Sequence, residues 1–341
     1  MIASNKVISD WIHKWSVLFV ENTVFNTTDP DQIATLIDDF CRRELASPVA
    51  TFLFYGSSQG AVCGVELLDG RRIVLKIHQP SRSLDFLNAV IQVQHYLIAS
   101  GYPCTKPLLE PKPIASGIAT VEELVDEGEY RDAHNPVIRR SIAEMLAWLI
   151  TLTWTPDAIP DLRPSSLDLR LPSGTTWPTP HSKLFDFEAT AKGAQWIDAI
   201  ARRTQEIKVQ GAGQLVIGHT DWGVKHFRYL PDERVRIIYD WDSLALEKEP
   251  IIVGHAAAYF TYTEFFDVER LPSREESQAF IAEYEAARGK PFTLEERKTL
   301  DAAMIYGLAY GARCEHALKP DEQDYPEGSS RALLAQHSSR M

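Results

Sequence analysis

The sequence predicts an α+β protein in which a small, sheet-rich lobe precedes a larger lobe that is mostly helical. Short runs of aliphatic and aromatic residues, separated by turn signals, begin at Thr51. Beyond about Asp126, apolar residues recur mainly at helical spacing. The chain has 341 residues, of which 45% are hydrophobic, so it is long enough for two domains of about 150 residues with buried cores.

Composition excludes several classes of protein. Acidic residues outnumber basic ones by 47 to 35, and no basic run could neutralise a phosphate backbone, so we expect no nucleic-acid partner. The four cysteines lie far apart without a Cys-x-x-Cys pair, which argues against a zinc site or a disulfide framework and fits a reducing cytoplasm. No apolar run approaches the ~20 residues of a membrane crossing, so we expect a cytoplasmic protein without a membrane segment.

Residues 1–48 are expected to form a helical extension with a packing role. Their apolar residues have helical spacing, and Asp29 and Pro30 stand where a helix would begin. We expect the sheet-rich lobe over residues 49–125 and the helical lobe over residues 126–341. The chain contains no internal repeat.

The sheet-rich lobe begins with three predicted strands, TFLFYG, AVCGVELL and RRIVLKIH, which form an antiparallel meander with Asp69 and Gly70 at a hairpin turn. The segment LDFLNAVIQVQHYLIASG predicts one long helix that ends before Gly101. The segments PCTKPLLEP and IASGIATVEELV then predict further short strands. They lead into an exposed connection.

The helical lobe starts with the amphipathic segment PVIRRSIAEMLAWLITLT. Residues 156–185 contain six prolines and lack periodicity, which predicts a long loop. A helix of about 18 residues is expected from about Ala191. Two short strands follow, LVI and VRII, and the remainder is mostly helical. The carboxy-terminal stretch YPEGSSRALLAQHSSRM is expected to be frayed.

The densest polar cluster comes directly after these two short strands. His219, Asp221 and His226 follow LVI, whereas Asp240 and Asp242 follow VRII. A turn signal, PDE, lies between the two strands, so we expect them to pair as a hairpin that brings Asp221, His226 and Asp240 together. Acidic and imidazole ligands at one place suit a divalent cation that bridges phosphates.

At these segments the sequence resembles the aminoglycoside phosphotransferase and choline kinase family, relatives of the protein kinases. The family's catalytic segment is His-x-Asp followed after four residues by Asn, and GHTDWGVKHFR resembles it with His226 in the Asn position. The segment IIYDWDS resembles the family's metal-binding segment. The resemblance implies a bilobal, protein-kinase-like fold and transfer of the γ-phosphoryl group of ATP or GTP to the hydroxyl of a small molecule.

The resemblance also implies roles for individual residues. Asp221 would accept the proton of the hydroxyl, and His219 would brace the catalytic loop. Asp240, His226 and Asp242 would hold magnesium or manganese. A lysine on the third strand, a glycine-containing loop after the first strand and a hinge after the last strand would bind the nucleotide. The residues at those positions are Lys76, Gly56, Ser57, Ser58, Gly60, Glu122 and Leu124.

Two positions depart from the family pattern. His226 stands where the family has an amide ligand, and because imidazole suits softer metals than magnesium, manganese would be favoured. The helix after Lys76 should supply a glutamate that orients this lysine, but it offers amides such as Gln94, and Asp85 lies too early in the helix. Residues 156–185 are expected to help shape the substrate pocket.

The sequence has features of three other classes of protein. The segment GSSQG matches the Gly-x-Ser-x-Gly elbow of α/β hydrolases, but that elbow requires a helix after the turn and another strand follows here. A metal-dependent hydrolase would leave Lys76 and the glycine-containing loop without a role, but it could use His219, Asp221, Asp240, Asp242 and His255. A kinase-like module without catalytic activity, which binds nucleotide or other proteins, is motivated by the two departures.

Overall fold

The protein was analysed as a computed structural model, which describes residues 5–15, 18–152, 162, 175–180, 182–263 and 270–338. The chain divides into two compact units, Met1–Asp126 and Glu127–Met341. Most of the predicted long loop, at residues 156–161, 163–174 and 181, lies outside the described residues. The prediction that this loop shapes a substrate pocket therefore stays a prediction.

The first unit contains an antiparallel sheet with the strand order β1-β2-β3-β5-β4. Consecutive strands β1, β2 and β3 pair as the predicted meander. Most residues of β2 and β3 are buried, whereas β1 is buried at Val49, Phe52 and Tyr55 and more exposed between them. The strands are β1 (Val49–Ser57), β2 (Ala61–Leu67), β3 (Arg72–His78), β4 (Pro107–Ile114) and β5 (Gly117–Glu123).

Local chemistry fixes the ends of these elements. Gly70 adopts φ +86° in the turn between β2 and β3, and its N–H donates to the Leu67 carbonyl. The helix α4 (Leu84–Ala99) begins at Ser83, whose hydroxyl accepts an N–H of the first turn. Gly101 follows α4 with φ +78°, in agreement with the predicted helix end.

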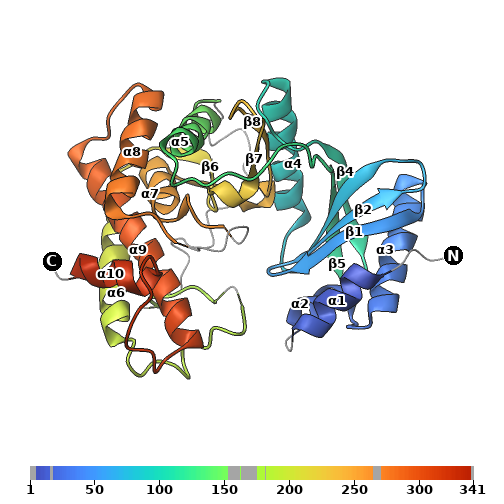
Figure 1. Cartoon of the computed structure of the whole chain (residues 1–341), viewed down its shortest axis with the longest axis horizontal. Coiled ribbons are helices and arrows are strands. Elements are labelled where there is room, and N and C mark those ends of the chain that lie inside the picture. Colours follow the sequence, from blue (N-terminus) through green and yellow to red (C-terminus); the bar gives the residue numbers. More distant parts are fainter. Residues whose placement is uncertain are drawn as a thin grey trace. The chain divides into compact units, whose positions relative to one another are not determined.

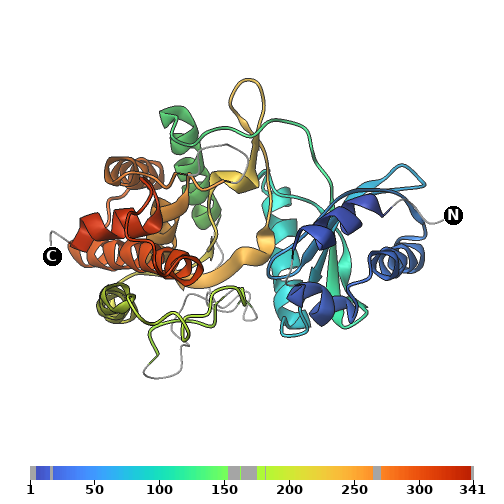
Figure 2. The ribbon, with the colours of Figure 1, turned by 60° about the horizontal axis from the view of Figure 1, so that its bottom comes forward.

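Three helices precede the sheet: α1 (Lys6–Lys14), α2 (Phe19–Phe25) and α3 (Pro30–Leu45). Asp29 caps α3, because its carboxylate accepts the N–H groups of two residues in the first turn. Figures 1 and 2 show these helices in dark blue beside the strands of the same unit. Their apolar side chains belong to one hydrophobic cluster with those of the sheet. Fully buried members include Ile8, Val24, Ile33, Phe40, Val65 and Leu75.

The second unit is mostly helical. The helix α9 packs against α6, α7 and α10, and α5 packs against α8. With the sheet of the first unit, this arrangement confirms the predicted α+β class. The helix expected from about Ala191 begins at Gln195, after a series of turns. The helices are α5 (Pro136–Thr151), α6 (Gln195–Gln210), α7 (Glu249–Tyr259), α8 (Arg274–Arg288), α9 (Leu294–Leu318) and α10 (Ser330–Ser338).

Two antiparallel strand pairs in this unit differ from the expected hairpin. The strand β6 (Leu215–His219) pairs with β9 (Leu244–Lys248), and β7 (Phe227–Tyr229) pairs with β8 (Val235–Ile238). The expected pairing of LVI with VRII is wrong. VRII forms β8, which pairs instead with β7, the strand that lies nearer to it along the chain. The β7–β8 hairpin is inserted between β6 and β9, so the loops after β6 and β8 still meet.

The carboxy-terminal stretch contains a packed helix, so the expected fraying is wrong for its described part. Leu334 of α10 is fully buried, and Arg331 is 2% exposed. The Arg331 N–H donates to a Glu315 carboxylate oxygen on α9 at 3.0 Å. These contacts with α9 stabilise a segment whose composition alone suggests disorder.

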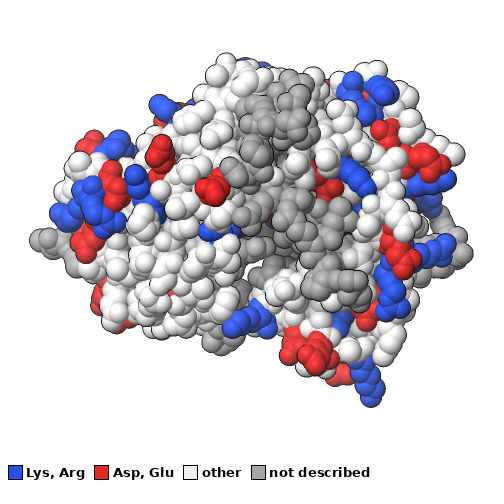
Figure 3. Space-filling model, turned by 180° about the vertical axis from the view of Figure 1, so that it is seen from behind, with Lys and Arg blue, Asp and Glu red and all other residues white. Residues whose placement is uncertain are grey.

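No helix in the described part of the chain has the length and apolar character needed to cross a membrane. The face of the molecule in Figure 3 carries lysine and arginine side chains next to aspartate and glutamate side chains. Exposed ion pairs such as Lys298 with Glu295 and Arg71 with Asp69 exemplify this mixture. The excess of acidic residues therefore does not form a continuous acidic field on that face.

Candidate active site

The loop after β6 carries the first half of the candidate site. Asp221 Oδ2 forms an ion pair with the Lys225 ammonium at 2.7 Å and lies 3.2 Å from His226 Nε2. Lys225 and His226 belong to a single turn of 3₁₀ helix, Val224–His226. The Trp222 indole N–H donates to the Ile142 carbonyl of α5, so the loop is anchored to the helical core.

The second half is the turn after β8. Asp240 has φ +68°, a left-handed conformation that non-glycine residues rarely adopt and that is common at functional sites. Its Oδ2 accepts from the Ser243 hydroxyl at 3.0 Å and lies 3.8 Å from His226 Nε2. A one-turn helix, Trp241–Ser243, follows and leads into β9.

Backbone hydrogen bonds join the two loops. The Thr220 N–H and hydroxyl both donate to the Ser243 carbonyl at 2.9 Å, and the Tyr239 N–H donates to the His226 carbonyl at 3.0 Å. Thr220 and Ser243 adjoin the paired strands β6 and β9, and Tyr239 and His226 adjoin the paired strands β8 and β7. The two strand pairs therefore determine the distance between the loops. The nested arrangement of β6–β9 around β7–β8 thus positions the acidic residues.

Asp221, His226 and Asp240 form a group of metal-ligating side chains. One ligand atom from each lies within 4.8 Å of those of the other two, and all three residues are partly buried. Two carboxylates and one imidazole are an N/O donor set that fits a divalent cation. Asp242 contributes no ligand atom to this group, so its place at the metal stays a prediction.

Electrostatics keeps Asp221 ionised. Burial acts to raise the pKa of its carboxyl, but the hydrogen bond from His226 and the positive charge of Lys225 outweigh burial and hold the pKa well below its usual range. The carboxylate is therefore available as a hydrogen-bond acceptor at neutral pH. This is the state that a proton acceptor requires.

His219 has a different environment. It is fully buried, and burial, with the nearby His226, lowers its pKa to about 4. The ring is therefore neutral at neutral pH, and Nδ1 accepts the N–H of Asp221 at 3.3 Å. Its edges contact the rings of Trp222 and Trp241, at centroid distances of 5.4 and 5.9 Å. This position is consistent with bracing of the loop rather than with proton transfer.

In the first unit, Lys76 is buried on β3 and lies opposite Thr120 of β5. Glu122 lies two residues beyond Thr120, so its side chain projects from the same face of the sheet as that of Lys76. Glu122 accepts hydrogen bonds from the Gln94 amide on α4 at 2.8 Å and from the Thr105 hydroxyl at 3.0 Å. The acid that α4 lacks is thus supplied to this face by β5.

The glycine-containing segment is a tight connection between β1 and β2. The Ser58 N–H donates to the Gly60 carbonyl at 3.0 Å. A Cβ at Gly60 would lie 2.6 Å from the Ile77 carbonyl oxygen, so only glycine allows this approach to β3. The Ser57 hydroxyl accepts from the Trp11 indole N–H of α1 at 3.1 Å.

Beyond β5, Leu124, which the sequence predicts to belong to a hinge, donates its N–H to the Arg72 carbonyl at 3.0 Å. This bond extends the pairing of β5 with β3 by one residue. The side chain of Glu122, the other hinge residue of the sequence prediction, is committed to Gln94 and Thr105. Any contact of the hinge with adenine would therefore come from its backbone groups.

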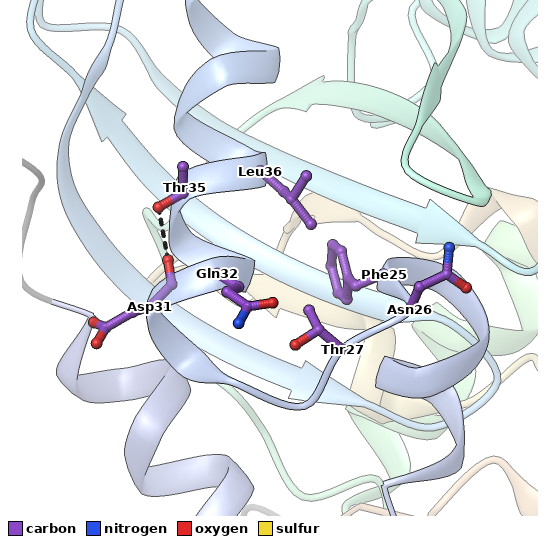
Figure 4. A pocket seen from close by; sticks show the side chains of 7 residues that line it. All are labelled: Phe25, Asn26, Thr27, Asp31, Gln32, Thr35 and Leu36. Carbon is purple, nitrogen blue, oxygen red and sulfur yellow. Dashed lines mark hydrogen bonds between the residues drawn. The ribbon is translucent and has the colours of Figure 1, made fainter.

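Two hollows in the first unit contain none of the predicted site residues. The larger, of about 440 Å³, lies between α2 and α3, and the smaller, of about 310 Å³, lies between α1 and β1. Figure 4 shows that the wall of the larger one combines the Phe25 ring with amides and hydroxyls. Its lining residues are Phe25, Asn26, Thr27, Asp31, Gln32, Thr35 and Leu36.

His255, which a hydrolase would use as a metal ligand, lies on α7 outside the metal-ligating group. It is 4% exposed, and neither ring nitrogen has a hydrogen-bond partner among the described residues. Burial, with the charge of Lys208, lowers its pKa from 6.5 to about 3. The residue is therefore a neutral histidine of the core.

This burial predicts a pH dependence of stability. The unfolded chain binds a proton at His255 below pH ~6.5, whereas the folded chain does so only near pH 3. The contribution of the neutral His255 to the free energy of unfolding is therefore complete above pH ~6.5. It is lost as the pH falls toward about 3, because protonation favours the unfolded chain. We expect His255→Gln to reduce the pH dependence of the free energy of unfolding by up to about 1.4 kcal/mol per pH unit. Urea unfolding between pH ~7 and ~5 measures this slope, and an unchanged slope contradicts the prediction.

No protein-family model matches the chain, and no curated protein is significantly similar to it. Solved structures do match over nearly the whole chain. An amicoumacin kinase in complex with AMP-PNP, Ca²⁺ and Ami has a TM-score of 0.59 at 14% identity, over 91% of this chain and 95% of that one. A spectinomycin phosphotransferase in complex with ADP and spectinomycin has a TM-score of 0.55 at 12% identity, over 90% and 94%.

A GDP complex of an aminoglycoside 2'-phosphotransferase also has a TM-score of 0.55 at 12% identity, over 89% of this chain and 98% of that one. At such low identity the similarity concerns the fold. The predicted bilobal, protein-kinase-like fold is confirmed. The chain thus shares its fold with these three solved structures.

Proposed function

We propose that this protein is a small-molecule kinase, which transfers the γ-phosphoryl group of ATP or GTP to a hydroxyl group. The observation that carries the proposal is the group formed by Asp221, His226 and Asp240, in which an ionised carboxylate lies beside a set of metal ligands. In a protein-kinase-like fold, this group occurs in the order and spacing that the family's catalytic and metal-binding segments have. Phosphoryl transfer requires little beyond such positioning and neutralisation of charge.

At phosphorus, the proposed reaction makes one bond and breaks one. The acceptor oxygen forms a bond to the γ-phosphorus, the bond between that phosphorus and the bridging oxygen breaks, and the nucleoside diphosphate leaves. Asp221 orients the acceptor hydroxyl and takes its proton. A divalent ion held by Asp240 and His226 would neutralise charge on the phosphate oxygens. His219 keeps the catalytic loop in place by accepting the Asp221 N–H.

Nucleotide binding is assigned to residues 49–125, with residues 126–341 supplying the catalytic and metal-binding loops. Lys76 would bind the phosphates, and backbone groups of residues 56–60 would cover them. Glu122, held by two hydrogen bonds on the same face of the sheet, would take the orienting role of the missing helix glutamate. Backbone groups at Glu122 and Leu124 would contact adenine.

The neighbours with bound antibiotics motivate the choice of acceptors. The amicoumacin kinase and the spectinomycin phosphotransferase are complexes with such compounds, and this chain has their fold. We therefore expect a small molecule with a hydroxyl group as acceptor. A suitable panel contains aminoglycosides, spectinomycin, choline, homoserine and simple sugars.

The imidazole ligand predicts a metal preference. Imidazole suits softer divalent ions than magnesium, so the wild-type protein should turn over faster with Mn²⁺ than with Mg²⁺ at equal concentration. His226→Asn restores the amide of the family pattern and should shift the ratio of kcat/KM toward Mg²⁺ by about tenfold, or ~1.4 kcal/mol. Activity titrations with both ions measure the ratio. A ratio unchanged by the substitution would remove His226 from the metal site.

Calorimetric titration of nucleotides tests the proposal at the level of binding. ATP and GTP are titrated with Mg²⁺, with Mn²⁺ and with a chelator. We expect binding that strengthens when the ion is present, because Asp240 and His226 would hold the ion and it would neutralise charge on the phosphates. Absence of binding under every condition would contradict the proposal and favour the interpretation as an interaction module.

A further inference from the structure

Lys225 lies at the catalytic carboxylate, although the sequence pattern gives it no role. Its ammonium nitrogen is 2.7 Å from Asp221 Oδ2. The same nitrogen lies 5.2 Å from the centre of the Tyr262 ring, an arrangement in which the ring face attracts a cation. Two contacts from different segments thus hold the ammonium beside Asp221, with 26% of the side chain exposed.

This position is close to the reacting atoms of the proposed function. A proton acceptor lies about 2.6–3.2 Å from the acceptor oxygen, and that oxygen lies about 3–3.5 Å from the phosphorus it attacks. An ammonium in contact with Asp221 is therefore within a few ångströms of the transferring phosphoryl group. Among the described residues, Asp221 is its one ion-pair partner, and an ammonium carries three N–H groups, so the group can also donate to a further acceptor.

We propose that Lys225 is a further catalytic residue, which donates a hydrogen bond to an oxygen of the γ-phosphoryl group while it is transferred. The inference rests on the proposed function. The charge of that group is spread over three equatorial oxygens in the transition state, and a point charge on a flexible stem can follow their movement. The proton of the acceptor hydroxyl goes to Asp221, so Lys225 takes no part in the proton transfer.

A simpler explanation is an ion pair between neighbouring turns that only supports Asp221. Exposed pairs of this kind contribute little to stability. The two explanations differ in what they predict for a mimic of the transferring group. A catalytic Lys225 contributes to binding of ADP with aluminium fluoride, which imitates the planar phosphoryl group, but not to binding of ADP alone.

The experiment compares the wild type with Lys225→Met, Lys225→Arg and, as a matched control, Lys298→Met. Lys298 forms an exposed pair with Glu295 on α9. We expect Lys225→Met to lower kcat by about 10²–10³ and Lys225→Arg to lower it less, with the KM for nucleotide nearly unchanged in both. Lys298→Met should retain wild-type kinetics, and urea midpoints of all variants should coincide.

Aluminium fluoride provides the second readout. Binding of ADP with aluminium fluoride should weaken in Lys225→Met, whereas binding of ADP alone should not. Equal affinity of both proteins for the mimic would reduce Lys225 to a positioning residue and overturn the inference. So would a kcat of Lys225→Met within a factor of about three of the wild type, given the losses that such donors cause.

Chemical rescue tests the charge itself. Lys225→Cys can be alkylated with bromoethylamine to restore an ammonium of similar length. Cys41, Cys63, Cys104 and Cys314 are all buried, and burial raises the pKa of each thiol, so the introduced cysteine is the reactive one. Alkylation should restore most of the lost kcat, and failure to restore it would contradict the inference. A wild type without transfer would contradict the proposed function, whereas an active wild type with an unimpaired Lys225→Met would overturn only this inference.

Discussion

Asp221→Asn is expected to lower kcat by about 10²–10⁴ while the affinity for nucleotide stays within a factor of about two. The amide keeps the size of the carboxylate but cannot accept the proton of the acceptor hydroxyl. Nucleotide affinity is retained because the phosphates are proposed to be bound by Lys76 and by the ion at Asp240. Steady-state kinetics and calorimetry on the same preparation separate the two effects.

Asp232→Asn is the matched control for this variant. Asp232 lies in the turn of the β7–β8 hairpin, at the end away from His226 and Asp240, and pairs with Arg234, so the same change of aspartate to asparagine occurs outside the site. Its kinetics should equal those of the wild type. If Asp221→Asn still turned over at the normal rate, Asp221 would not be the proton acceptor.

Asp240→Asn is expected to abolish turnover and the dependence of nucleotide binding on the divalent ion. An amide is a much weaker ligand than a carboxylate for a hard cation. Asparagine is the appropriate replacement because Asp240 has φ +68°, and asparagine adopts this left-handed conformation more readily than alanine. The variant therefore tests the ligand without additional backbone strain.

The measurement for this variant is Mn²⁺ binding in the presence of nucleotide, followed by electron paramagnetic resonance. The wild type should bind the ion, and Asp240→Asn should bind it at least about tenfold more weakly, or ~1.4 kcal/mol. Nucleotide binding in the presence of a chelator should be equal in both proteins. Equal affinity for Mn²⁺ would show that the ion is held elsewhere.

Much of the fold follows from local signals in the sequence. The turn at Gly70, the cap at Ser83 and the helix start at Asp29 are decided by neighbouring residues, so the first unit could be predicted element by element. The pairing of β6 with β9 could not be predicted in this way, because it joins segments separated by the whole β7–β8 hairpin. The packing of α10 on α9 depends on the same kind of long-range contact.

The candidate site likewise contains residues that local spacing identifies and residues that only long-range contacts identify. Asp221, His226 and Asp240 could be found because they lie in two short segments with recognisable spacing. The acid on the same face of the sheet as Lys76 could not be found from the sequence. Glu122 lies on β5 rather than on β3 or α4, and its side chain meets Gln94 of α4 only in the folded protein. Residue spacing gives no indication that two side chains meet across elements. The role inferred for Lys225 likewise needed the distance of its ammonium to Asp221.

The most direct test of the central claim is a transfer assay with the purified protein. ATP or GTP is incubated with Mn²⁺ or Mg²⁺ and the panel of hydroxyl compounds, and mass spectrometry detects phosphorylated acceptors. We expect the wild type to form a phosphomonoester and nucleoside diphosphate in equal amounts, and Asp221→Asn to form neither. Nucleotide that binds but keeps its γ-phosphate with every acceptor and with water, or equal product from both proteins, would contradict the account.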